Sequence, residues 1–294
     1  CWVSPVIHFK TLLHTVGRFL LFLAGAMLIP LVYALWIWED VAPFAVAFVI
    51  TASSAALILV FTGRPKSDLS AREGALLVFA IWIATSVFGC IPFYLSAFYP
   101  GFTDAFFEAS SGFTTTGATV LADVEVLPRG IQLWRCFTHW LGGMGIVLLA
   151  IAILPLVGVG GMPLYRAEFS GAKSEKLKPR ITETAIALWK IYLALTLAQY
   201  LALRWAGMNR LEAACHTFST LGTGGFSTRT ASIAAFNSVT IEIIIVVFML
   251  LAGMSFALHY RFWVERDLRS FFRDIELRFY LIVVAAATLA IVAS

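Results

Sequence analysis

The stretches SSGFTTTGAT at 110–119 and STLGTGGFST at 219–228 are two versions of one pattern. The shift that places Thr115 on Thr223 also places Gly117 on Gly225. One such run would be weak evidence, because turns use threonine, glycine and serine constantly. Its recurrence in the same context indicates an internal repeat. We call the displacement from Thr115 to Thr223 the repeat shift.

Each run follows a short apolar segment that opens with an acid, Asp104–Ser111 in the first copy and Glu212–Ser219 in the second. Long apolar segments flank both copies. The repeating unit is therefore a full span, a short half-span, a Thr/Gly loop and a second full span. Both copies run in the same orientation with an even number of full spans, whereas the inverted repeats of many secondary transporters need an odd number.

The long segments have the length of membrane helices. The chain has 294 residues, of which 60% are hydrophobic and 13% charged, against roughly 25% charged in soluble domains. Blocks of about 20 apolar residues are the length that crosses a bilayer as a helix. We therefore predict an all-α, polytopic membrane protein. The expected spans are 19–38, 41–61, 74–98, 131–157, 183–205 and 239–260, with the non-spanning regions 99–130 and 206–238 between them.

The basic residues predict the orientation. Of the 21 Lys and Arg, 15 lie at the start and in the loops 64–73, 158–182 and 261–278. Cytoplasmic loops carry this excess, so the N-terminus is expected in the cytoplasm and both non-spanning regions outside. This distribution also argues against nucleic acid as a partner.

The chain does not begin with Met, and its closing apolar run, 279–294, is shorter than a full span. We therefore expect a fragment of a longer polypeptide.

The loops have a chemistry that suits a cation. Extended backbone at membrane depth is tolerated only when it is buried in protein or lines water. Glycine permits the dihedral angles that turn successive carbonyls toward one axis, and rings of carbonyls can replace the hydration shell of K⁺. The half-span would direct the negative end of its dipole at the ion. The candidate K⁺ ligands, through their backbone carbonyls, are Thr115, Thr116, Gly117, Thr223, Gly224 and Gly225.

Beyond these loops, the sequence resembles the transmembrane subunits of the Trk/Ktr potassium-uptake family, and its two leading spans resemble the TrkH type. The motifs that carry the resemblance are 110–119, 219–228, Leu133-Trp134-Arg135, Trp140-Leu141-Gly142-Gly143-Met144-Gly145, Leu164-Tyr165-Arg166-Ala167-Glu168 and a turn at Pro179-Arg180-Ile181.

The resemblance implies K⁺ uptake across the inner membrane, with some Rb⁺ or Na⁺, through four span–loop–span repeats around one pore. It also implies two subunits per assembly and a cytosolic nucleotide-binding regulatory subunit of the TrkA type. Only two complete repeats are present here. We expect a two-helix leader at 1–66, pore repeats at 67–160 and 161–272, and the start of a third at 273–294. The family's gating loop and its positively charged pore residue belong to later repeats. We expect no organic cofactor.

Other polar and small residues admit two interpretations. Glu108 and His216 align across the repeat, and we favour hydrogen bonding that orders the loop from behind over direct contact with the ion. We expect His139 to be packed or interfacial, and Gly142-Gly143 to allow close helix packing.

Ser111 with His139 raises an intramembrane serine protease as a less favoured alternative, and a secondary transporter with broken helices is another. H-E-x-x-H, C-x-x-C and Walker motifs do not occur.

Overall fold

The computed structural model describes residues 8–63, 71–143, 178–255 and 273–293, together with 145, 258, 259 and 262. No strand occurs in these residues, which confirms the all-α prediction. Within them, five helices are long and apolar enough to cross a membrane: Phe9–Trp36, Ala42–Thr62, Glu73–Leu95, Ala185–Trp205 and Ile275–Ala293.

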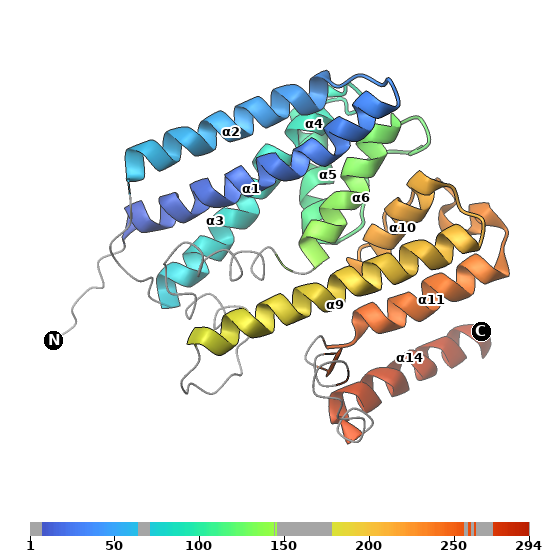
Figure 1. Ribbon diagram of the computed structural model, residues 1–294. Helices are drawn as coiled ribbons and strands as arrows, with labels where there is room; N and C mark the ends of the chain where they lie inside the picture. The colour runs from blue at the N-terminus through green and yellow to red at the C-terminus, as the bar shows by residue number, and fades with distance from the viewer. Residues whose placement is uncertain are drawn as a thin grey trace.

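The leader is a helical hairpin of α1 (Phe9–Trp36) and α2 (Ala42–Thr62), which lie side by side in Figure 1. The start of α2 is fixed by its first turn, where the Asp40 carboxylate accepts from the Ala42 amide at 2.9 Å and proline occupies an early position. Proline suits that position because its missing N–H would have no helical partner there.

The described residues of the first repeat form four helices. They are α3 (Ala71–Gly89), α4 (Ile91–Leu95), α5 (Phe102–Phe113) and α6 (Arg129–Gly143). The break between α3 and α4 frees the Gly89 carbonyl, and the Trp134 indole N–H donates to it at 3.0 Å. A helix end buried without such a partner would be costly.

The second repeat has the same succession of long helix, half-span and second helix in α9 (Lys178–Trp205), α10 (Arg210–Leu221) and α11 (Val239–Gly253), but its short 3-10 helix η1 (Ser232–Phe236) follows the half-span, whereas α4 precedes it in the first repeat. Helix α14 (Ile275–Ala293) comes last, and Figure 1 shows it beside α11. The Tyr280 hydroxyl donates to the Leu250 carbonyl at 3.5 Å and joins these two helices.

Helix α6 holds the centre of the arrangement. It packs against α5 of its own repeat, against α10 of the next repeat and against α1 of the leader (Figure 1). The Glu39 carboxylate, in the turn of the leader, accepts from the Arg129 and Gly130 amides at 3.2 and 2.9 Å. An acid at this place satisfies donors at the start of α6 and suits the positive end of its dipole.

The structure corrects two boundary predictions. The turn expected at Pro179-Arg180-Ile181 is wrong, because these residues lie in the first turns of α9, where proline is tolerated. The last apolar run was expected to be too short to span, but α14 begins at Ile275 and has 19 residues. The motif at 164–168 and most of the second half of the predicted span 131–157 lie outside the described residues.

Candidate functional site

The two half-spans are helices of identical length at equivalent positions. Helix α5 and helix α10 each have 12 residues, and the repeat shift relates their bounds at both ends. An extended residue precedes each helix, Gly101 in the first copy and Asn209 in the second. The Asn209 side chain accepts from the Glu212 amide at 2.9 Å, as a helix N-cap does. The sequence repeat is therefore a structural repeat.

The loops that follow these helices also match. We call 114–120 the first loop and 222–228 the second loop. Three backbone hydrogen bonds close each helix end, and every partner in the second copy is the repeat equivalent of its counterpart in the first. They are Thr114→Ser110, Thr115→Gly112 and Thr116→Ser111 in the first copy, and Gly222→Phe218, Thr223→Thr220 and Gly224→Ser219 in the second.

The backbone conformation repeats as well. Thr115 and Thr223 have φ values of 54° and 53°, and Gly117 and Gly225 have 77° and 101°. A positive φ is uncommon for a non-glycine residue and a genuine outlier for a β-branched one. Such strain persists only where the surroundings hold it, and it clusters at functional sites. Two threonines with the same strained backbone therefore indicate that the functional site lies in these loops.

The two loops touch at the residues that the sequence predicted. A Cβ placed on Gly117 would overlap the Gly224 carbonyl oxygen, and this Cβ would lie 3.8 Å from the Cα of Gly225. The structure thus brings Gly117, Gly224 and Gly225 together from two repeats. Their neighbours Thr115, Thr116 and Thr223 are placed in the same two loops.

Glu108 holds the first loop from the side of helix α5. Its carboxylate is fully buried. The Thr119 hydroxyl donates to it at 2.9 Å and the Val120 amide at 3.3 Å. The Ser111 hydroxyl donates to the Ala118 carbonyl at 2.6 Å. The predicted hydrogen bonding of Glu108 to its neighbours is confirmed.

His216 stands at the equivalent position behind the second loop. Its Nδ1 lies 2.8 Å from the Glu212 carbonyl, which can only accept, so Nδ1 carries the hydrogen. In the neutral ring, Nε2 then accepts from the Ser227 hydroxyl at 3.0 Å. Ser227 is the repeat equivalent of Thr119. Glu108–Thr119 and His216–Ser227 are therefore the same contact made with different chemistry.

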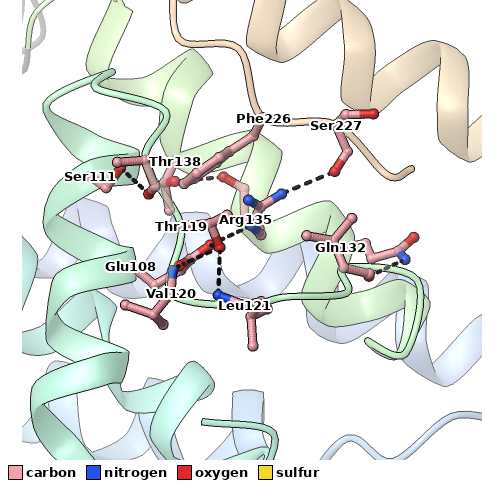
Figure 2. Close-up of polar contacts among 12 residues, drawn as sticks. Glu108, Ser111, Thr119, Val120, Leu121, Gln132, Arg135, Thr138, Phe226 and Ser227 are labelled. Atoms are coloured by element: carbon pink, nitrogen blue, oxygen red, sulfur yellow. Dashed lines mark hydrogen bonds and ion pairs between the residues drawn. The ribbon is translucent and has the colours of Figure 1, made fainter. Parts of the chain in front are cut away.

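Arg135 joins the two loops, although its sequence context did not assign it to the site. Its Nε forms an ion pair with Glu108 at 2.5 Å, and its Nη1 donates to the Ser227 carbonyl at 3.0 Å (Figure 2). Its Cζ lies 3.6 Å from the centre of the Phe226 ring. An arginine inside an apolar block was the available signal, since such a charge needs a buried partner.

His139 is packed, as expected. It is fully buried, and its ring stacks on Phe226 with centroids 4.0 Å apart. Its Nδ1 accepts from the Phe226 amide at 3.4 Å. The Ser111 hydroxyl is engaged with Ala118. These contacts give a serine protease dyad of Ser111 and His139 no support.

The glycines of α6 let this helix approach both loops closely. A Cβ on Gly142 would overlap the Phe113 carbonyl oxygen, and one on Gly143 would overlap Gly222. The packing interpretation of Gly142-Gly143 is confirmed. These contacts place the loop ends directly against α6.

Beyond the loops, the segments that follow them are joined. The Thr230 hydroxyl donates to Asp123 at 2.7 Å, and this bond, with one from the Glu125 amide, lowers the pKa of the Asp123 carboxyl. Arg229 pairs with Glu125 at 3.0 Å and with Glu212 at 2.7 Å. These two carboxylates raise the pKa of the Arg229 guanidinium, which stays charged.

Comparison with known proteins agrees with this geometry. The family model for TrkH, described as a cation transport protein, matches residues 42–294. The chain belongs to the TrkH family. It is 43% identical over 279 residues to the Trk system potassium uptake protein TrkH of Escherichia coli (strain K12), covering 93% of this chain and 57% of that protein. It is 46% identical over 271 residues to the protein of that name from Halomonas elongata, covering 91% and 55%.

The fold agrees with a solved member of the TrkH family. The crystal structure of the potassium transporter TrkH from Vibrio parahaemolyticus matches with a TM-score of 0.82 and 37% identity, covering 96% of this chain and 58% of that one. The chain thus spans somewhat more than half the length of the TrkH-family relatives it matches. A multi-pass membrane protein of the cation transport class is the description that these matches and the apolar helices support.

Proposed function

We propose that the chain forms part of a K⁺ uptake pathway in the inner membrane, with the carbonyls of the first and second loops as ligands of the dehydrated ion. The observation that carries the proposal is the contact between Gly117 and Gly224, two residues of loops with the same strained backbone. Carbonyls fixed by strained backbone can replace water around K⁺. The proposed ligands are Thr115, Thr116, Gly117, Thr223, Gly224 and Gly225.

The remaining parts of the proposal rest on the family, on the basic loops and on the sequence repeat. The transported ion is K⁺, with weaker passage of Rb⁺ and Na⁺, and the role is transport rather than catalysis. The N-terminus is cytoplasmic, and the segment between α5 and α6 faces outside. A cytosolic nucleotide-binding subunit of the TrkA type and a second copy of the full-length protein are the proposed partners. The proposed division is a leader at 1–66, repeats at 67–160 and 161–272, and a third repeat beginning at 273.

The experiment is K⁺ uptake by bacteria that lack their own K⁺ uptake systems and express the full reading frame that encodes this chain. Growth at low K⁺ and uptake of K⁺ above Na⁺ are the expected results. Uptake that needs a second, co-transported ion at fixed stoichiometry would favour the secondary transporter instead. A membrane-inserted protein without K⁺ uptake, in the presence of the regulatory subunit, contradicts the proposal.

The location is tested separately. A thiol reagent that cannot cross the membrane should label a cysteine introduced at Glu125 and should not label one introduced at Lys10. The reverse labelling would contradict the proposed orientation.

A further inference from the structure

Arg135 is a buried charge with three different contacts. Its side chain is only 3% exposed. A charge in the interior is costly unless it is paired and hydrogen-bonded. The ion pair with Glu108, the hydrogen bond to the Ser227 carbonyl and the Phe226 ring supply this compensation (Figure 2). The guanidinium fork can serve two acceptors at once, which a lysine ammonium on a flexible stem does less well.

These contacts belong to two different loops. Glu108 is bound to Thr119 and Val120 of the first loop. Ser227 and Phe226 belong to the second loop. Thr119 and Ser227 are equivalent under the repeat shift. Arg135 therefore connects equivalent points of two neighbouring loops, one through Glu108 and the other directly.

The second repeat lacks this connection. Helices α6 and α11 have the same length and are offset by 110 positions, so the equivalent of Arg135 on α11 is Ile245, a buried apolar residue. The position equivalent to Glu108 is His216, which forms a hydrogen bond with Ser227 of its own loop. The connection thus runs from the first repeat to the second and is not a general feature of the repeating unit.

The ion pair also limits the electrostatic effect on the pore. Arg135 and Glu108 carry opposite charges 2.5 Å apart, so together they present little net charge to an ion. A role in geometry is therefore favoured over direct attraction or repulsion of the cation.

We infer that Arg135 is a positioning residue that fixes the first loop relative to the second and thereby sets the discrimination between K⁺ and Na⁺. The inference rests on the proposed function. Ion discrimination depends on where the carbonyls stand, and Arg135 determines how two loops of carbonyls are spaced.

The main variant is Arg135→Lys in the full-length protein, which keeps the charge and loses the fork. Arg129→Lys is the matched control, because it is the same substitution at an exposed position of the same helix. Arg135→Lys should lower the ratio of K⁺ to Na⁺ uptake by about two- to tenfold, the range for loss of one hydrogen bond. Arg129→Lys should leave this ratio unchanged.

A second variant removes both charges and keeps hydrogen-bonding groups, Arg135→Gln with Glu108→Gln. Because it leaves no unpaired buried charge, it should insert in normal amount and still lose discrimination. Unchanged discrimination in both variants, at normal amounts of inserted protein, overturns the inference. A fall in protein amount alone, with the uptake ratio intact, shows a role in stability only and also overturns it.

A readout without transport separates this inference from the proposed function. Amide hydrogen exchange should accelerate in both 118–121 and 226–229 in Arg135→Lys, and in neither segment in Arg129→Lys. Faster exchange in neither loop, or in one loop alone, contradicts the connection even if K⁺ uptake is normal. Absence of K⁺ uptake in the unmodified protein contradicts the proposed function, while the exchange experiment still decides whether Arg135 couples the loops.

Discussion

Gly117 of the first loop stands directly against the carbonyl oxygen of Gly224 in the second loop. The two residues come from separate repeats. Only a residue without a side chain can occupy the place of Gly117, because a Cβ there would overlap the carbonyl. The contact fixes how close the two loops come. It also means that the equivalent glycines Gly117 and Gly225 differ in how well they tolerate an added side chain.

This inequality gives the first prediction. Gly117→Ser should weaken the preference for K⁺ over Na⁺ more than Gly225→Ser. Both residues have positive φ, which costs a side-chain residue about 1–2 kcal/mol. Gly117 carries the additional overlap with Gly224, whereas a Cβ on Gly225 meets nothing within 4 Å. Competitive uptake of K⁺ and Na⁺ by the full-length variants measures the difference. If both variants prefer K⁺ as strongly as the unmodified protein does, these residues are not part of the ion site.

The second prediction concerns the contact of α6 with the end of α5. Gly142→Ala should reduce uptake and lower the melting temperature, because the added methyl group overlaps the Phe113 carbonyl and forces α6 away from the point where the first loop begins. Overpacking of this kind costs about 1–3 kcal/mol. Gly25→Ala on α1 is the control, since nothing lies within 4 Å of its Cβ. Thermal unfolding in detergent checks both, and a Gly142→Ala protein as stable as the control contradicts the close packing.

The third prediction concerns pH at the segments that follow the two loops. The pKa of Asp123 is lowered, so the stabilising effect of its bond to Thr230 is fully present above the usual carboxyl pKa of about 3.9 and is lost as the pH falls through the lowered pKa. Hydrogen exchange of 123–125 should therefore show no loss of protection between pH 8 and pH 5. Thr230→Val removes the donor and should accelerate exchange throughout this range. A loss of protection that begins near pH 6 or 7 would show that another group controls this segment.

Much of the site could be predicted because its pattern is local and repeated. The repeat shift aligns Thr115 with Thr223 in the sequence, and the same shift holds for the bounds of α5 and α10, the closing hydrogen bonds and the positive φ values. A half-span followed by glycine and threonine has few other uses at membrane depth. The pattern therefore predicted the elements and the loop residues.

The contacts between repeats could not be predicted in this way. Arg135 looked like one of a few basic residues outside the loops that we predicted to be cytoplasmic, and its partners lie 27 positions before it and 92 after it. Sequence spacing on one helix says nothing about such distant partners. Helix boundaries failed for another reason, because α9 and α14 continue through polar residues that hydropathy assigns to loops.

The last prediction is that the 294-residue polypeptide, prepared by itself, will not form a selective pore as a monomer. The family resemblance implies four repeats around one pore, of which the sequence predicts two complete ones in this chain. Two loops form half of a ring of carbonyls, and groups left facing lipid cost several kcal/mol each. The side chains of α14 are largely exposed, among them Phe279 at 69% and Leu289 at 69%, so this helix has wide apolar surface for lipid or further protein. We expect flux into liposomes only from an associated form, with the oligomeric state established by crosslinking. Potassium-selective flux from a demonstrated monomer would overturn both this prediction and the four-repeat pore on which it rests.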